Sequence, residues 1–201
     1  MTPYYDHKGI TIYNNDCMKI MREMPDKSVD LCLTDPPYGL NKKMNGGTWG
    51  LKYNISDMMD WDYFPSEEVF KEIFRISKNQ IIWGGNYFNL PPSRCFLSWN
   101  KPYFPTLSDF ELAWTSFDKL CKKFEANRIS NKSHPTEKPI ELMKWCISNY
   151  SKETDTIFDP FLGSGTTLVA AKQLGRKAIG VEISEKYCAI AKDRLAQEVL
   201  L

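Results

Sequence analysis

Two turns in this chain carry residue types whose order and spacing suit chemistry on a flat amino group. The first, residues 34–39 with the sequence Thr-Asp-Pro-Pro-Tyr-Gly, follows the apolar run 29–33, which predicts a short buried strand. Pro36 fixes its own φ and disfavours helical geometry at Asp35, and proline nitrogens donate no hydrogen bond. The Asp35 and Pro36 carbonyls can therefore act as acceptors beside the Asp35 carboxylate, and the Tyr38 ring offers a stacking face. By itself, this hexapeptide is also typical of an ordinary strand-ending turn.

The second turn, residues 158–167 with the sequence Phe-Asp-Pro-Phe-Leu-Gly-Ser-Gly-Thr-Thr, also follows a predicted strand and opens a predicted helix. Its glycines let the backbone approach a ligand closely. Glu182 stands 23 residues after Asp159, near the roughly 20-residue spacing at which an acid holds ribose hydroxyls in nucleotide-binding βαβ units. The glycine-lysine pattern of phosphate-binding loops is absent, and the Asp159 carboxylate would repel a pyrophosphate. That carboxylate suits instead the cationic amino-acid end of S-adenosylmethionine.

Apolar periodicity predicts the elements that must position these turns. Strands are expected at residues 8–14, 29–33, 80–85, 95–99, 110–115, 156–158 and 177–182. Helices are expected at residues 18–24, 66–76, 140–150, 167–174 and 185–195. The alternation predicts an α/β fold with a mostly parallel sheet, helices on both faces and a crevice at the carboxyl ends of the strands.

The middle of the chain departs from this alternation. The strands at 95–99 and 110–115 could pair as an antiparallel hairpin that closes one sheet edge. Residues 116–138 look irregular and locally basic, which is compatible with either a phosphate-contact segment or a solvated surface. Residues 40–60, polar and glycine-bearing, predict either a mobile loop over a site or a plain surface loop.

Composition restricts the class of protein. A length of 201 residues with 42% hydrophobic and 25% charged residues predicts a single globular domain, 1–201, and the net charge of +1 leaves nucleic-acid binding to local patches. Six scattered cysteines and two histidines predict reduced core thiols and no metal site. Neither a secretory signal nor an apolar run of the ~18 residues needed for a membrane helix is present, so we expect a cytoplasmic protein with no membrane partner.

Four motifs in order resemble the DNA amino-methyltransferases of the permuted β group, in which the catalytic loop precedes the cofactor loop. Besides Asp-Pro-Pro-Tyr-Gly at 35–39 and the glycine turn at 159–167, these are Asn-Asp-Cys at 15–17 and Ser-His-Pro-Thr-Glu-Lys-Pro at 133–139. The matches run from residue 10 to residue 195. The resemblance implies a Rossmann-like, seven-stranded, S-adenosylmethionine-dependent methyltransferase fold with a circularly permuted motif order.

The resemblance also implies site residues. S-adenosylmethionine, released as S-adenosylhomocysteine, would bind without a metal to residues from both ends of the chain: Asp16, Cys17, Asp35, Thr136, Lys138, Asp159, Pro160, Phe161, Gly163, Ser164, Gly165, Thr166, Thr167 and Glu182. Among these, Thr136 and Lys138 are expected near the methionine carboxylate. The catalytic residues would be Asp35, Pro36, Pro37 and Tyr38. Contacts to DNA are expected from Tyr38, Gly39, Trp49, Lys122, Lys123 and Arg128.

The activity implied is restriction-modification DNA methylation: methyl transfer to the exocyclic N6 amine of an adenine flipped out of double-stranded DNA. Asp as the first residue of the catalytic motif favours N6-methyladenine, because the family uses Ser more often for cytosine N4. Cytosine-N4 methylation, RNA base methylation and a catalytically silent nucleic-acid-binding subunit are the alternatives. The recognition sequence, a homodimer, a cognate restriction endonuclease and a bacterial or phage origin stay open, since only about twenty residues, 116–133, are available for target recognition.

Overall fold

The computed structural model of the chain describes residues 1–39, 63–101, 108–126 and 137–196. The predicted loop at 40–60 and ten residues of the basic segment, 127–136, lie outside the described residues. Three expected site residues, Trp49, Arg128 and Thr136, lie outside them as well.

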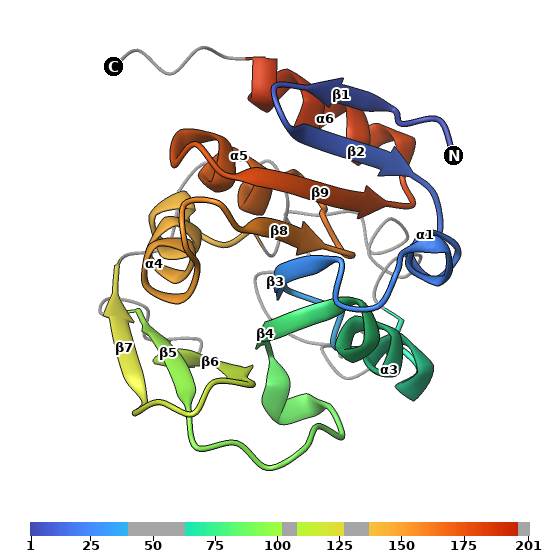
Figure 1. Cartoon of the computed structure of the whole chain (residues 1–201). Helices are drawn as coiled ribbons and strands as arrows, with labels where there is room; N and C mark the ends of the chain where they lie inside the picture. Colours follow the sequence, from blue (N-terminus) through green and yellow to red (C-terminus); the bar gives the residue numbers. More distant parts are fainter. Residues whose placement is uncertain (40–62, 102–107, 127–136, 197–201) are drawn as a thin grey trace, which may run out of the picture.

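A single mixed sheet organises the described chain, and its strand order is β1-β2-β9-β8-β3-β4-β6-β5-β7 (Figure 1). The strands are β1 (Tyr5–His7), β2 (Ile10–Asn14), β3 (Val29–Thr34), β4 (Ser77–Trp83), β5 (Phe96–Asn100), β6 (Phe110–Thr115), β7 (Lys122–Glu125), β8 (Thr156–Asp159) and β9 (Lys177–Glu182). The five central strands β2, β9, β8, β3 and β4 are mutually parallel. Their carboxyl ends therefore meet along one edge of the sheet.

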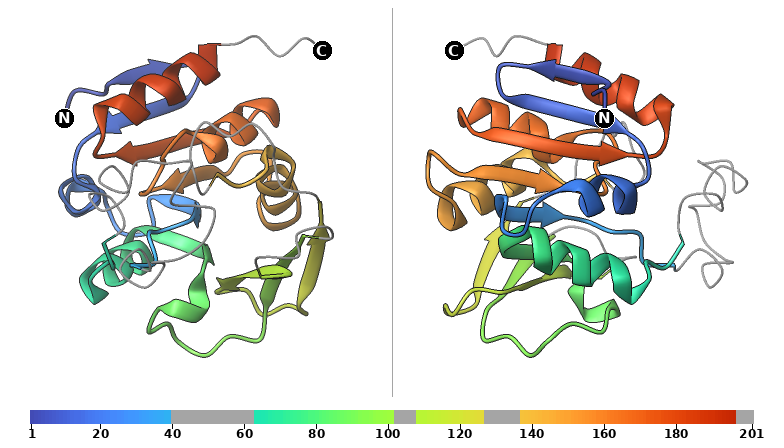
Figure 2. Two further views of the ribbon diagram at one scale, coloured as in Figure 1. Left: turned by 180° about the vertical axis from the view of Figure 1, so that it is seen from behind. Right: turned by 45° about the vertical axis from the view of Figure 1, so that its right-hand side comes forward.

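Helices cover both faces of this sheet, as Figures 1 and 2 show. They are α1 (Cys17–Glu23), α3 (Glu67–Ile76), α4 (Ile140–Tyr150), α5 (Thr166–Gln173) and α6 (Glu185–Ala196), with a 3-10 turn, η2, at Gly85–Tyr87. Buried side chains of α1 and α3 form one hydrophobic cluster, and those of α4, α5 and α6 form another on the opposite face. The C-terminal helix α6 lies beside the N-terminal strands β1 and β2, so elements from the two ends of the described chain pack together (Figure 1).

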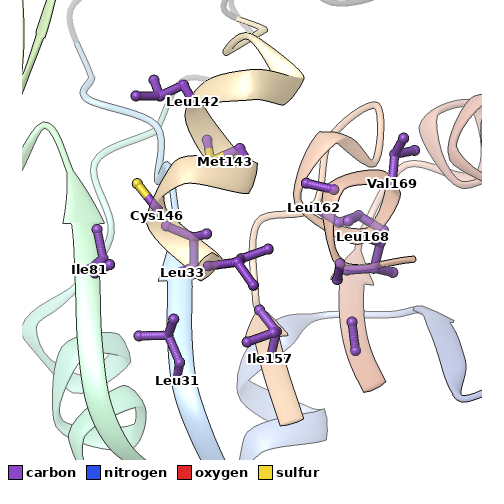
Figure 3. Close-up of a cluster of buried hydrophobic side chains, with 14 of the residues drawn as sticks. Leu31, Leu33, Ile81, Leu142, Met143, Cys146, Ile157, Leu162, Leu168 and Val169 are labelled. Atoms are coloured by element: carbon purple, nitrogen blue, oxygen red, sulfur yellow. The ribbon is translucent and has the colours of Figure 1, made fainter. Parts of the chain in front are cut away.

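Local sequence explains these elements. In α3, the residues Val69, Phe70, Ile73 and Ile76 recur at helical spacing and are buried, while two glutamates occupy the first turn, where the helix dipole favours negative charge. Strands β3 and β8 are buried along nearly their whole length because helices cover both of their faces. Figure 3 shows Leu33 of β3 next to Cys146 of α4, with Leu31 on the same strand beside Ile157 of β8.

Three sequence predictions need correction. The described sheet has nine strands rather than seven. Residues 122–125, predicted to be irregular, form β7, which pairs in parallel with β5, so the antiparallel β5–β6 hairpin is one strand in from the sheet edge. At the other edge, residues 5–7 form β1, which pairs antiparallel with β2.

No helix among the described residues is both long and apolar enough to cross a bilayer.

Candidate active site

The carboxyl ends of the parallel strands bring together acids that are far apart in sequence. Asp16 follows β2, Glu182 ends β9, Asp159 ends β8 and Asp35 follows β3, in the order in which these strands lie in the sheet. The permuted motif order therefore does not separate the two turns. Both meet at the switch-point edge where doubly wound sheets bind ligands.

Asp35 is held from two sides. Its Oδ2 lies 2.6 Å from the Lys138 ammonium, which arrives from the segment just before α4, and its Oδ1 accepts a hydrogen bond from the Tyr38 hydroxyl. The Lys138 ammonium also lies 3.0 Å from Oε2 of Glu111 on β6. Oε1 of Glu111 in turn accepts a 2.9 Å bond from Lys101 at the end of β5. Four side chains from four segments thus alternate in charge.

Burial makes this cluster electrostatically important, because the side chains of Lys101 and Lys138 are each only 4% exposed. Burial disfavours the Lys138 cation, but the Asp35 and Glu111 carboxylates outweigh it and raise the lysine pKa well above its usual range. Burial likewise disfavours the Glu111 carboxylate, yet Lys138 and Lys101 lower its pKa to about 2. At Asp35, burial raises the pKa and Lys138 offsets only part of that rise. Asp35 is therefore the most readily protonated acid of the cluster.

The Tyr38 ring has aromatic neighbours on the 3-10 turn that follows β4. It stacks on Tyr87 with ring centres 5.0 Å apart and meets Phe88 edge-on at 6.1 Å. The Lys138 ammonium lies 5.8 Å from the Tyr38 ring centre, within cation–π range. Gly84 makes this packing possible: its φ is +67°, and a Cβ there would lie 2.1 Å from Cε1 of Tyr38.

A buried hydrogen bond joins the strand end before Asp35 to the glycine turn. The Thr34 hydroxyl donates to Oδ1 of Asp159 at 2.7 Å, and the Phe161 N–H donates to the same oxygen at 3.1 Å. Asp159 is 3% exposed, and burial raises its pKa to about 6 despite these donors. Asp159 therefore anchors the turn, and its carboxylate is much less open to a ligand than the sequence suggested.

Glu182 is fixed by backbone donors. Its Oε2 accepts from the Gly163 N–H at 2.8 Å and its Oε1 accepts from the Ser184 N–H at 2.9 Å. Asn14 at the end of β2 donates to the carbonyls of Glu182 and Ile183, which sets the start of α1 beside Glu182. Next to it, a Cβ added at Gly163 would meet no atom within 4 Å. The turn thus leaves open space against an anchored carboxylate.

Asp16 and Cys17 stand at the start of α1. The Asp16 carboxylate caps this helix by accepting from the Met18 N–H at 2.7 Å. Cys17 is the first helical residue and is buried, and burial raises the pKa of its thiol to about 12. Its thiol therefore packs as a protonated, apolar side chain beside the Asp16 cap.

Arg194 of α6 was missed in the sequence and holds the glycine turn from behind. Its guanidinium donates at 2.8 Å to both the carbonyl and the hydroxyl of Ser164, and pairs with Glu137 at 2.8 Å. The Thr166 hydroxyl also lies within 3.4 Å of Glu137. Ser164 and Thr166 thus help to fix the turn, and a lone arginine in a predicted closing helix gave no signal of this contact.

The structure brings only some of the predicted residues together. Asp35, Tyr38, Asp159, Phe161, Gly163 and Glu182 gather at the strand edge as expected. Lys138 is also there, but its ammonium contacts Asp35 and Glu111, and its expected contact with a cofactor carboxylate stays a prediction. Lys122 and Lys123 lie exposed on the edge strand β7. Glu111 and Lys101 were missed, because single charged residues beside apolar strands are common.

The described residues contain no group of three acids, cysteines or histidines that could hold a metal ion.

Comparison with known proteins then identifies the chemistry. A family model described as DNA methylase, for N6 and N4 amino-methyltransferases, matches residues 82–193. The chain belongs to this DNA methylase family.

Sequence similarity to curated relatives extends along nearly the whole chain. It is 29% identical to the type II methyltransferase M2.LlaDCHI of Lactococcus lactis subsp. cremoris over 96% of this chain and 91% of that protein. Among solved structures, the PvuII DNA methyltransferase (cytosine-N4-specific) has a TM-score of 0.70, 18% identity and coverage of 99% and 90%. The M1.HpyAVI–SAM complex has a TM-score of 0.63, 23% identity and coverage of 92% and 99%. These structural likenesses establish the methyltransferase fold.

Proposed function

We propose that this DNA methylase transfers a methyl group from S-adenosylmethionine to the N6 amine of an adenine flipped out of double-stranded DNA. The observation that carries the proposal is the Asp35 carboxylate at the end of β3, held by Lys138 and Tyr38 beside the glycine turn. A neutral Ser hydroxyl in place of Asp35 would accept hydrogen bonds from an amine less strongly than a carboxylate does.

Support for the cofactor comes from the space beside Gly163 and from the donor set around it. Glu182 would bind the ribose hydroxyls, Asp16 would lie at the adenine end, and the turn from Phe161 to Gly165 would pass along the methionine part. When bound, S-adenosylmethionine supplies a methyl group on a positively charged sulfur. The solved M1.HpyAVI structure is a complex with this cofactor.

In the proposed reaction, Asp35 and Pro36 would orient the target amine. The target amine is a poor nucleophile because its lone pair is delocalised into the base. Accepting its two N–H groups at the Asp35 carboxylate and the Pro36 carbonyl would bend the nitrogen toward tetrahedral geometry and aim its lone pair at the methyl carbon. As the new N–C bond forms, the S–C bond breaks and its electron pair stays on sulfur. The nitrogen would then release one proton, which the Asp35 carboxylate would accept.

Duplex DNA is the proposed partner. A base within the DNA stack cannot reach a pocket at the sheet edge. The base must rotate out of the helix, at a cost of a few kcal/mol. Lys122 and Lys123 on β7 are exposed and could contact phosphates, and Gly39, Trp49 and Arg128 stay predicted DNA contacts. A homodimer, a cognate endonuclease and a bacterial or phage cytoplasm also stay predictions.

The experiment is transfer of tritiated methyl from S-adenosylmethionine to unmethylated duplex DNA and, in parallel, to RNA, followed by chromatography of the nucleosides, with Asp35→Ala as the inactive control. Label in N6-methyladenine that disappears in the variant would support the proposal. Label in N4-methylcytosine would replace adenine by cytosine as the target. Label on RNA alone would exclude DNA as the substrate. Cofactor binding without transfer to either nucleic acid would indicate a silent subunit.

A further inference from the structure

Glu111 bridges the two buried lysines behind the catalytic loop. Its two carboxylate oxygens serve different partners: Oε2 pairs with Lys138 at 3.0 Å and Oε1 accepts from Lys101 at 2.9 Å. Glu111 pairs with Trp99 across the β5–β6 hairpin, and Lys101 follows the end of β5. The hairpin therefore presents a carboxylate, already neutralised on one side, to the lysine that holds Asp35.

We infer that Glu111 is a positioning residue for methyl transfer, which acts through Lys138 to fix the orientation and the charge of the Asp35 carboxylate. The inference rests on the proposed function, since Asp35 must be the group that binds the target amine. Glu111 itself has no role in contacting the base. It keeps the Lys138 ammonium at Oδ2 of Asp35.

The hydrogen-bonding capacity of Asp35 explains why this matters. An ionised carboxylate has about four acceptor positions. Lys138 fills one on Oδ2 and the Tyr38 hydroxyl fills one on Oδ1, so the plane of the carboxylate is fixed from both sides. The positions that remain are all acceptors only while Asp35 is ionised. A proton on Asp35 would place a donor where the amine hydrogens must bind.

The charges around Asp35 determine how each substitution should act. The groups that face it are Lys138 from before α4, Glu111 on β6, the Tyr38 hydroxyl from its own loop and Asp159 at the end of β8. Lys138 favours the ionised form of Asp35, whereas Glu111 disfavours it. Removing the lysine charge should therefore make Asp35 harder to ionise. Removing the glutamate charge should make it easier to ionise, in the opposite direction.

The test is the pH dependence of the single-turnover rate of methyl transfer to duplex DNA, measured between about pH 5 and pH 9, where the acid limb reports a carboxylate that must be ionised. Lys138→Met should move the acid limb up by about one pH unit or more, the effect of losing a cation within 4 to 6 Å. Glu111→Gln should move it down, because one negative charge is lost. It should also lower the plateau rate about tenfold or more, because glutamine replaces one of the two acceptor oxygens, each of which serves a different lysine, with an NH2 donor.

Further variants separate this role from a structural one. Lys138→Arg keeps the charge and should leave the acid limb near its wild-type position. The double variant Glu111→Gln with Lys138→Met removes both charges, so its acid limb should lie closer to the wild-type position than that of either single variant. It also replaces Lys138→Met in the test if that single variant fails to fold. The exposed pair Glu68 and Lys71 of α3 supplies matched controls, because Glu68→Gln and Lys71→Met make the same chemical changes outside this cluster.

Binding of S-adenosylhomocysteine, measured by titration calorimetry, gives a readout independent of transfer. All cluster variants should bind it within about threefold of wild type. A large loss of affinity in Lys138→Met would instead support contact with the cofactor carboxylate and overturn the inference. So would acid limbs that stay in place, or shift in the same direction, in both single variants. A wild-type protein that transfers no methyl group would refute the proposed function itself, which is a separate failure.

Discussion

The position of the Tyr38 ring can be perturbed from outside its own loop by Gly84→Ala. At Gly84 φ is +67°, and the added Cβ would lie 2.1 Å from Cε1 of Tyr38. Ordinary carbon–carbon contact is about 3.5 to 4.0 Å, so the ring must move by roughly 1.5 Å. Because the Tyr38 hydroxyl also holds Oδ1 of Asp35, the carboxylate is displaced with it. A misplacement of about 1 Å can cost on the order of a hundredfold in rate.

The control is Gly175→Ala. Gly175 has the same φ of +67°, but a Cβ there would meet no atom within 4 Å. Both alanines should lose the roughly 1 to 2 kcal/mol that a left-handed L-residue costs, which for a chain of this size lowers Tm by about 2 to 8 °C. Only Gly84→Ala should also lose about a hundredfold in kcat/KM for methyl transfer, or roughly 2.7 kcal/mol.

Thermal unfolding and tritiated-methyl transfer on the same two preparations measure the two effects separately. A folded Gly84→Ala protein with the wild-type transfer rate would refute the idea that the Tyr38 ring position matters. Equal losses of transfer in Gly84→Ala and Gly175→Ala would show that backbone strain alone is responsible.

Three further predictions concern stability and the aromatic pair. Burial raises the pKa of Asp159 from 3.8 to about 6, so the folded state keeps a proton that the unfolded state releases, and this group should contribute roughly 3 kcal/mol of stability below pH 3.8 that is lost as pH rises to 6. Urea unfolding should show that the free energy of unfolding falls less between about pH 4 and pH 7 in Asp159→Asn than in the wild type. Arg194→Met removes the 2.8 Å partner of Glu137, whose side chain is 5% exposed, and urea unfolding should show a loss of about 3 to 5 kcal/mol. Tyr87→Ala removes the ring stacked on Tyr38. Stacking worth about 0.5 to 1.5 kcal/mol corresponds to an approximately two- to twelvefold fall in kcat/KM, and Tyr87→Phe should lose much less.

Different results would contradict each of these predictions. For Asp159, an equal change with pH in wild type and Asp159→Asn would mean that other groups carry the dependence. For Arg194, the double variant with Glu137→Gln should lose less than Arg194→Met alone, because no buried carboxylate is then left without this partner. For Tyr87, equal losses in the alanine and phenylalanine variants would assign its effect to the hydroxyl instead of the ring.

The sequence was most informative where chemistry and local structure coincide. Two prolines after Asp35 and two glycines after Asp159 each mark a strand-ending turn, and their residue types also restrict what the turn can bind. The parallel order of β2, β9, β8, β3 and β4 follows from strands alternating with helices. These local patterns therefore predicted the strand edge, both turns and the acid at Glu182.

The elements that were missed depend on contacts that local pattern does not encode. Strand β7 has three exposed residues and one partly buried residue, so it shows no apolar alternation, and it forms because β5 offers an unpaired edge. Glu111 is one charged residue at the start of an ordinary strand pattern. Its importance arises only when α4 brings Lys138 against the hairpin, and sequence alone does not predict that packing.

Contacts across the full length of the chain explain how the permuted order still gives one site. Asn14 of β2 donates to the carbonyls of Glu182 and Ile183, 168 and 169 residues away, so the adenine end and the ribose end of the proposed cofactor site meet only when β9 inserts beside β2. Thr34 and Asp159 make the corresponding link, 125 residues apart, between the loop that carries Asp35 and the glycine turn. In each half of the site, a residue is therefore held by a hydrogen bond from a residue far away in the sequence. A displacement at either turn should be felt at the other, because Thr34 stands next to Asp35 and the Phe161 N–H shares the same oxygen of Asp159.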